Sequence, residues 1–132
     1  MSQANQPIRV LLVDDSLPYR ELVGILLTRD PGFVVVAETS DGIEAIDMVE
    51  KHHPDVVLLD IAMPRMDGLQ ALPAIKAAHP LTKVVVLSAF SESEMLEKAS
   101  GRGADAYLEK GKLLKEIRET IERVHGYSKA AT

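Results

Sequence analysis

The feature that most constrains the fold is a series of short aliphatic runs spaced along the chain. Ile8–Val13, Asp55–Asp60 and Lys83–Ser88 are almost uninterrupted in Val, Leu and Ile, whereas Phe33–Glu38 and Ala104–Leu108 are more mixed. Uninterrupted aliphatic runs are typical of strands that are covered on both faces, and such strands belong to parallel sheets. The pattern therefore predicts five strands in a parallel sheet.

Helix-length segments separate the predicted strands, and most carry side chains at helical spacing. Ser16 is a suitable cap for the first helix, and Pro18 is tolerated in its first turn. The spaced positions are Leu22, Ile25, Leu26 and Arg29 in the first segment, Ile43, Ile46 and Val49 after Asp41-Gly42 in the second, and Leu114, Ile117, Ile121 and Val124 in the last. Two further helices are predicted within Gly68–Ala78 and Ser91–Ser100. Because parallel strands need right-handed crossovers, this pattern predicts an α/β fold with helices on both faces of the sheet.

Pro73 lies inside the third helical segment and cannot donate a backbone hydrogen bond to the carbonyl of residue 69. We therefore expect this helix to begin late, near Leu72, or to be irregular at its start.

The length of 132 residues fits one domain. We expect an N-terminal extension over residues 1–7, the domain over 8–125 and a small polar tail over 126–132. Residues 1–7 have neither the charged nor the apolar region of a signal peptide, and no apolar run approaches the roughly 20 residues that span a bilayer. The expected compartment is the cytoplasm, without membrane attachment.

Composition excludes several classes of site. The chain has no cysteine, so disulfide scaffolds, thiolate zinc sites and cysteine nucleophiles are excluded. Its 15 basic and 20 acidic side chains give a formal net charge of −5, and no basic run is present. Binding of nucleic acid by this chain alone is therefore not expected.

Polar residues follow the predicted strands at their carboxyl ends. Asp14 and Asp15 follow the first strand, Asp60 ends the third, Ser88 ends the fourth and Lys110 follows the fifth. Taken singly, each could be a cap, a turn residue or a solvated side chain. Together they would share the sheet edge where ligands bind in open parallel sheets. Three neighbouring carboxylates need a cation, and an all-oxygen set suits Mg²⁺, while a carboxylate can also form an aspartyl phosphate.

Four segments resemble one known family, the receiver domain of two-component response regulators. They are VLLVDDS (10–16), DVVLLDIAMPRMDG (55–68), VVVLSA (84–89) and GADAYLEK (103–110), and the resemblance covers about residues 8–125. It implies a doubly wound, flavodoxin-like (βα)5 three-layer sandwich with parallel sheet order 2-1-3-4-5.

The resemblance also implies a role for each matching residue. Asp60 would be the phosphoacceptor, acting with Ser88 and Lys110, and Ser88 and Tyr107 would form the switch. The implied cofactor is Mg²⁺, and the implied metal ligands are Asp15 directly, Asp14 partly through water, Asp60, and the backbone carbonyl of Ala62.

The sequence departs from the commonest family pattern at four positions. Gly111 follows Lys110 where many members have proline, and Ser88 stands where threonine is commoner. Ala62 cannot orient an attacking water, and Phe90 is bulky beside the same site. These departures bear on the lifetime of the phosphorylated state and leave the acceptor chemistry in place.

The leading functional hypothesis is a stand-alone phospho-receiver, which is a signalling module and no enzyme. It would accept its phosphoryl group from a sensor histidine kinase or a phosphotransfer protein. A homodimer or output partner would use the face made by the fourth helix, the fifth strand and the fifth helix. Two alternatives are the receiver portion of a longer helix-turn-helix DNA-binding regulator and an aspartate-nucleophile phosphatase. The second is disfavoured because Asp14 and Asp15 are adjacent, whereas that class has a D-x-D pair.

Overall fold

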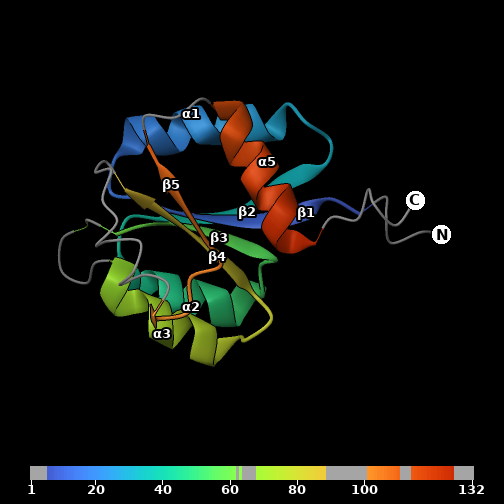
Figure 1. The fold of residues 1–132 in the computed structure, drawn as a ribbon. Coiled ribbons are helices and arrows are strands. Elements are labelled where there is room, and N and C mark those ends of the chain that lie inside the picture. The colour runs from blue at the N-terminus through green and yellow to red at the C-terminus, as the bar shows by residue number, and fades with distance from the viewer. Residues whose placement is uncertain (1–5, 62, 64–67, 89–100, 111–113, 127–132) are drawn as a thin grey trace.

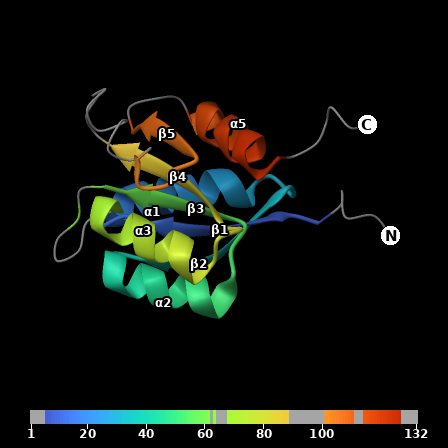
Figure 2. The ribbon, with the colours of Figure 1, turned by 60° about the horizontal axis from the view of Figure 1, so that its bottom comes forward.

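The computed structural model describes residues 6–61, 63, 68–88, 101–110 and 114–126. A five-stranded parallel sheet forms the middle of the molecule, with α1 and α5 on one face and α2 and α3 on the other (Figure 1). Figure 2 shows α2 and α3 side by side across the sheet from α1. The predicted α/β architecture, with helices on both faces of a parallel sheet, is confirmed.

The strand order is β2-β1-β3-β4-β5, as the family resemblance implied. The strands are β1 (Ile8–Val13), β2 (Phe33–Thr39), β3 (Val56–Asp60), β4 (Lys83–Ser88) and β5 (Ala106–Glu109). The strands β1 and β4 have the predicted bounds at both ends, and the bounds of the other three strands differ from the predicted ones by one or two residues. The order places β1 and β3 side by side, so the residues that follow these two strands meet at one edge of the sheet.

Side chains alternate between two hydrophobic cores, one on each face of the sheet. Along β1, Val10 and Leu12 face α1 and α5, whereas Leu11 and Val13 face α2 and α3. All four are at most 2% exposed. Both faces of the central strands are thus covered by apolar side chains, which explains the uninterrupted aliphatic runs in the sequence.

Helix α1 (Leu17–Thr28) is capped by Ser16, as predicted, and its side-chain oxygen accepts a hydrogen bond from the backbone nitrogen of Tyr19. The residues whose spacing marked this helix in the sequence are not the ones that it buries. Leu22 and Ile25 are 50% and 52% exposed, and the buried residues are Val23 and Leu27. Apolar residues occupy both sides of α1, so spacing alone did not identify the buried side.

Helix α2 (Gly42–His52) begins at the Asp41 cap, whose side chain accepts a hydrogen bond from the backbone nitrogen of Glu44. Of its predicted stripe, Val49 is fully buried and Ile43 is 46% exposed. Helix α5 (Leu114–His125) buries Ile117 and Ile121 against the sheet, as predicted. The predicted fourth helix, within 91–100, lies outside the described residues.

Helix α3 (Gly68–Ala78) corrects the expectation of a late start, because it begins at Gly68 and contains Pro73 in its interior. Proline removes the donor that would bond to the carbonyl of Leu69. That carbonyl instead accepts a hydrogen bond of 2.8 Å from Nη1 of Arg102. The helix therefore tolerates proline because a side chain distant in sequence replaces the missing donor.

Replacing Pro73 by alanine should stabilise the protein. The position is exposed, so no packing is lost, and alanine is about 3 kcal/mol better than proline inside a helix. Since this helix already accommodates proline, we expect a gain of about 1–2 kcal/mol in the free energy of unfolding, measured by urea denaturation. An unchanged or lower stability would show that the helix is adapted to proline in some other way.

Among the residues that the structure describes, none of the helices combines the length and the hydropathy needed to cross a membrane.

Candidate acidic site at the carboxyl edge of the sheet

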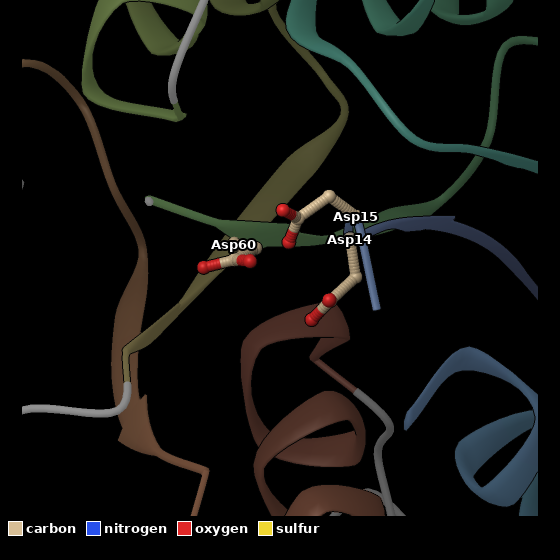
Figure 3. A group of neighbouring side chains, drawn as sticks. All are labelled: Asp14, Asp15 and Asp60. Carbon is tan, nitrogen blue, oxygen red and sulfur yellow. The ribbon is translucent and has the colours of Figure 1, made fainter. Parts of the chain in front are cut away.

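Three carboxylates gather where β1 and β3 end. Asp60 is the last residue of β3, and Asp14 follows Val13, which pairs with Leu59 in the sheet. One oxygen atom from each of Asp14, Asp15 and Asp60 lies within 4.8 Å of the other two (Figure 3). Asp14 and Asp60 are each 2% exposed, whereas Asp15 is exposed. The sequence prediction that these three residues share one edge is confirmed by the structure.

Lys110 brings the only ammonium group that the described residues place between these carboxylates. Its Nζ lies 2.7 Å from Oδ2 of Asp14 and 3.2 Å from Oδ2 of Asp60. Burial on its own would lower the pKa of Lys110, but the hydrogen bond to Asp14 and the charges of Asp60 and Asp14 outweigh it and raise the pKa above its usual value. Lys110 is therefore held as a cation at neutral pH.

Asp14 is fixed by contacts with residues at the start of α1. Its Oδ1 accepts a hydrogen bond of 2.8 Å from the backbone nitrogen of Ser16. Its Oδ2 lies 2.7 Å from the ammonium of Lys110, which neutralises its charge. Nη1 of Arg20 donates to the backbone carbonyl of Asp14 at 2.5 Å, and Arg20 also pairs with Glu38. The carboxylate is thus oriented before any ligand arrives.

The remaining predicted site residues lie around this cluster. Ser88 is fully buried at the end of β4, and its carbonyl accepts a hydrogen bond of 2.8 Å from the backbone nitrogen of Lys110. Tyr107 is half-buried on β5 and packs against the core beneath α2 and α3. Ala62, Phe90 and Gly111 lie outside the described residues.

Sequence reasoning missed the role of Tyr19 at this site. Its ring centroid lies 4.8 Å from Nζ of Lys110, a cation–π contact. The sequence does contain a pattern that places Tyr19 on the buried side of α1. Tyr19, Val23 and Leu27 follow one another at intervals of four residues and so lie on one face of the helix. The competing spacing of Leu22 and Ile25 obscured it.

Gly68 contributes to this site through the space that it leaves. Its φ is not positive, so the backbone conformation does not require glycine here. A Cβ atom at this position would lie 2.3 Å from the carbonyl oxygen of Asp60 and 2.8 Å from Cα of Ile61. Glycine is needed because the start of α3 packs directly on the backbone of Asp60.

The charges of the cluster suit a divalent cation. Two carboxylates about 5 Å apart repel each other by about 3 kcal/mol at an effective dielectric constant of 20. Within the described part of the chain, one ammonium group opposes the three carboxylates, so that negative charge is in excess there. Oxygen ligands in such a cluster match the preference of Mg²⁺.

The raised pKa values of two side chains at this site predict that the folded protein loses stability at alkaline pH. Burial raises the pKa of the Tyr19 phenol above its ordinary value; the ammonium of Lys110 opposes this shift, and the carboxylates of Asp14 and Asp60 support it. Because the folded state holds this proton more tightly, the unfolded chain loses its proton first, from about pH 10 upward. The raised pKa of Lys110 acts in the same direction, at slightly higher pH.

The free energy of unfolding should therefore stay level up to about pH 10 and fall above it. The decline should be shallower in Tyr19→Phe, which has no phenol to ionise. Urea denaturation of the parent and of Tyr19→Phe, below and above about pH 10, measures the two declines. Equal declines would contradict the attribution of the stability loss to ionisation of Tyr19.

Comparison with known proteins agrees with this geometry. Residues 10–122 match the family model of the response regulator receiver domain. The chain is 42% identical over 114 residues to a protein-glutamate methylesterase/protein-glutamine glutaminase of Methanospirillum hungatei, a match covering 85% of this chain and 33% of that protein. It is 36% identical over 116 residues to the chemotaxis protein CheY of Listeria monocytogenes, covering 88% and 97% respectively.

A solved structure shows the same likeness. The CheX–CheY–BeF3–Mg²⁺ complex from Borrelia burgdorferi contains a chain that superimposes with a TM-score of 0.84 at 28% identity, covering 90% of each chain. The chain spans about a third of the methylesterase and nearly all of the Listeria protein. The family match covers most of the chain and includes each of the strand ends that form the acidic cluster. On this evidence the chain belongs to the response regulator receiver domain family of two-component systems, as its sequence predicted.

Proposed function

We propose that this chain accepts a phosphoryl group on Asp60 from the phosphohistidine of a sensor histidine kinase or a phosphotransfer protein in the cytoplasm. The observation that carries the proposal is the setting of Asp60 itself. It is a buried carboxylate at the end of a central strand, with the ammonium of Lys110 at 3.2 Å and two more carboxylates within 4.8 Å. A nucleophile, a counterion and a candidate cation site thus lie together.

The transfer step needs no reagent besides the phosphohistidine donor. A carboxylate oxygen of Asp60 forms a bond to phosphorus while the bond between phosphorus and the donor nitrogen breaks, and the electron pair returns to the imidazole. The product is an acyl phosphate. The ammonium of Lys110 and the hydroxyl of Ser88 are proposed to stabilise the negative charge on the phosphoryl oxygens.

The described residues fit a bound Mg²⁺ ion. Asp14, Asp15 and Asp60 would hold it, together with the backbone carbonyl of Ala62, which lies outside the described residues. Mg²⁺ bound there would neutralise charge on the phosphoryl oxygens. The Borrelia complex, whose name includes both Mg²⁺ and the phosphoryl analogue BeF3, supports this part of the proposal.

Phosphorylation by a small donor tests the proposal without knowledge of the kinase. After incubation with Mg²⁺ and acetyl phosphate or phosphoramidate, intact-mass measurement should show one added phosphoryl group. Chelation of Mg²⁺ by EDTA should prevent the addition. No added mass in the presence of Mg²⁺, or equal labelling with and without EDTA, would contradict the proposal.

The phosphoryl signal is proposed to leave through Ser88 and Tyr107. Attraction of the Ser88 hydroxyl to the phosphoryl group would open space for Tyr107, which lies on β5 opposite Val86 of β4. The output surface would combine residues 89–100, which lie outside the described residues, with β5 and α5. A homodimer or an output partner would bind there.

Hydrogen exchange tests this route. Addition of BeF3 and Mg²⁺ should change amide exchange in residues 89–109 more than in α2, because the switch residues lie on the neighbouring strands β4 and β5. Tyr107→Ala should weaken the response. Larger remote changes in α2, or a response unaffected by Tyr107→Ala, would contradict the route.

The receiver role applies equally to a stand-alone protein and to part of a longer regulator. The relatives include both arrangements, since the same region is a third of the methylesterase and nearly the whole of the Listeria CheY. We propose no catalytic activity beyond transfer to Asp60 and loss of the phosphoryl group from it.

A further inference from the structure

Tyr19 lies at the acidic cluster although it is neither a carboxylate nor a predicted switch residue. Its position is fixed by the start of α1, where its backbone nitrogen donates a hydrogen bond of 3.3 Å to Oγ of Ser16. Its half-buried side chain packs on the core beneath α1 and α5. The ring thus has a defined place before Lys110 approaches it.

The ammonium of Lys110 has three neighbours in the described part of the chain. Two are the charged oxygens of Asp14 and Asp60, at 2.7 and 3.2 Å. The third is the ring of Tyr19, whose centroid lies 4.8 Å away. The ring attracts the cation through its quadrupole and, unlike a carboxylate, binds neither a metal ion nor a phosphoryl group.

A lysine at this site needs such a support because its side chain is long and flexible. Ordering a lysine side chain costs up to about 2 kcal/mol of rotamer entropy. The backbone of Lys110 is held at the end of β4 through its hydrogen bond to Ser88, but that bond does not fix the four-carbon stem. If a metal ion occupied Asp14, the attraction of Lys110 to that carboxylate would weaken, whereas the contact with the ring would remain.

The hydroxyl of Tyr19 does not explain why a tyrosine occupies this position. It is buried and has no hydrogen-bond partner among the described residues. A buried hydroxyl without a partner is unfavourable, so the useful part of this side chain is the aromatic ring. Phenylalanine should therefore replace tyrosine at this position, and an aliphatic side chain should not.

We infer that Tyr19 is a positioning residue for phosphoryl transfer, its ring holding the ammonium of Lys110 over Asp60 through a cation–π contact. This inference rests on the proposed function of Asp60. A residue that merely filled the core would be replaced equally well by leucine, methionine or phenylalanine. A positioning ring would be replaced only by phenylalanine.

The contact itself can be tested without phosphorylation. In protein with ¹³C-labelled lysine, the ε-protons of Lys110, assigned from Lys110→Arg, should be shifted upfield by the ring current. The shift should persist in Tyr19→Phe and disappear in Tyr19→Leu and Tyr19→Met. Ordinary chemical shifts for Lys110 in the parent protein would overturn the inference, whatever the phosphorylation results.

The role is tested by the rate of labelling with phosphoramidate and Mg²⁺. Tyr19→Phe should keep the parent's maximal rate, and the two aliphatic variants should lose about three- to tenfold, with a smaller change in the half-saturating donor concentration. Leu22→Ala, at an exposed position on the same helix, should match the parent. Thermal unfolding checks that each variant is folded. If one of the two aliphatic variants does not fold, the other still tests the role of the ring.

Equal maximal rates in the phenylalanine and aliphatic variants would overturn the positioning role while leaving Asp60 as acceptor. Absence of labelling in the parent would instead contradict the proposed function and, with it, the role of Tyr19.

Discussion

Replacing Asp60 by asparagine is expected to abolish labelling by acetyl phosphate or phosphoramidate, because the amide oxygen is too weak a nucleophile to attack phosphorus. The fold should survive this change. Asparagine has nearly the same shape, and it removes one of three negative charges that repel one another across less than 5 Å. The free energy of unfolding in the absence of Mg²⁺ should therefore be equal to that of the parent or higher.

The matched control is Asp47→Asn, which makes the same chemical change at an exposed position on α2. It should be labelled as fully as the parent, as measured by intact mass. Full labelling of a correctly folded Asp60→Asn protein would show that another residue accepts the phosphoryl group.

The second large effect is expected from Gly68→Ala. The added methyl group would overlap the carbonyl oxygen of Asp60, at 2.3 Å, and would come within 2.8 Å of Cα of Ile61. Both atoms belong to the backbone, so the start of α3 and the end of β3 must separate. We expect a loss of about 3 kcal/mol in the free energy of unfolding and slower labelling, because the phosphoacceptor lies on the displaced strand end.

Gly24→Ala supplies the control, since it makes the same substitution within α1. A Cβ atom there would meet only Cδ1 of Leu12, at 4.0 Å, which is an ordinary contact. Alanine should stabilise α1 by up to about 1 kcal/mol because it favours the helix more than glycine does. Equal urea midpoints for the two variants would contradict the proposed role of Gly68.

The sheet and the three carboxylates were predictable because they depend on features that a sequence displays directly. Aliphatic runs locate buried parallel strands, and the residues after such strands must meet at one edge. The neighbours Asp14 and Asp60 follow from this reasoning once the strand order is known. The order itself came from the family resemblance.

Other features depended on contacts that spacing does not encode. Two apolar series compete on α1, and only the packed structure shows that Val23 and Leu27 are buried while Leu22 is exposed. The regular helix around Pro73 depends on Arg102, which is 33 residues away from the carbonyl of Leu69 that it contacts. The close approach of Gly68 to Asp60 likewise requires the position of α3 relative to β3.

The central claim, that Asp60 is the phosphoacceptor, is tested most directly by locating the modified residue chemically. Borohydride reduces an acyl phosphate by two hydride transfers. The first hydride adds to the carbonyl carbon and displaces phosphate, which leaves an aldehyde, and the second reduces that aldehyde to the alcohol, so that the aspartate becomes homoserine. After phosphorylation, reduction and proteolysis, peptide mass spectrometry should find homoserine at position 60, and the unphosphorylated protein should show none. Homoserine at Asp14 or Asp15 in place of Asp60, or a phosphoryl group mapped to a serine or histidine, would contradict the account.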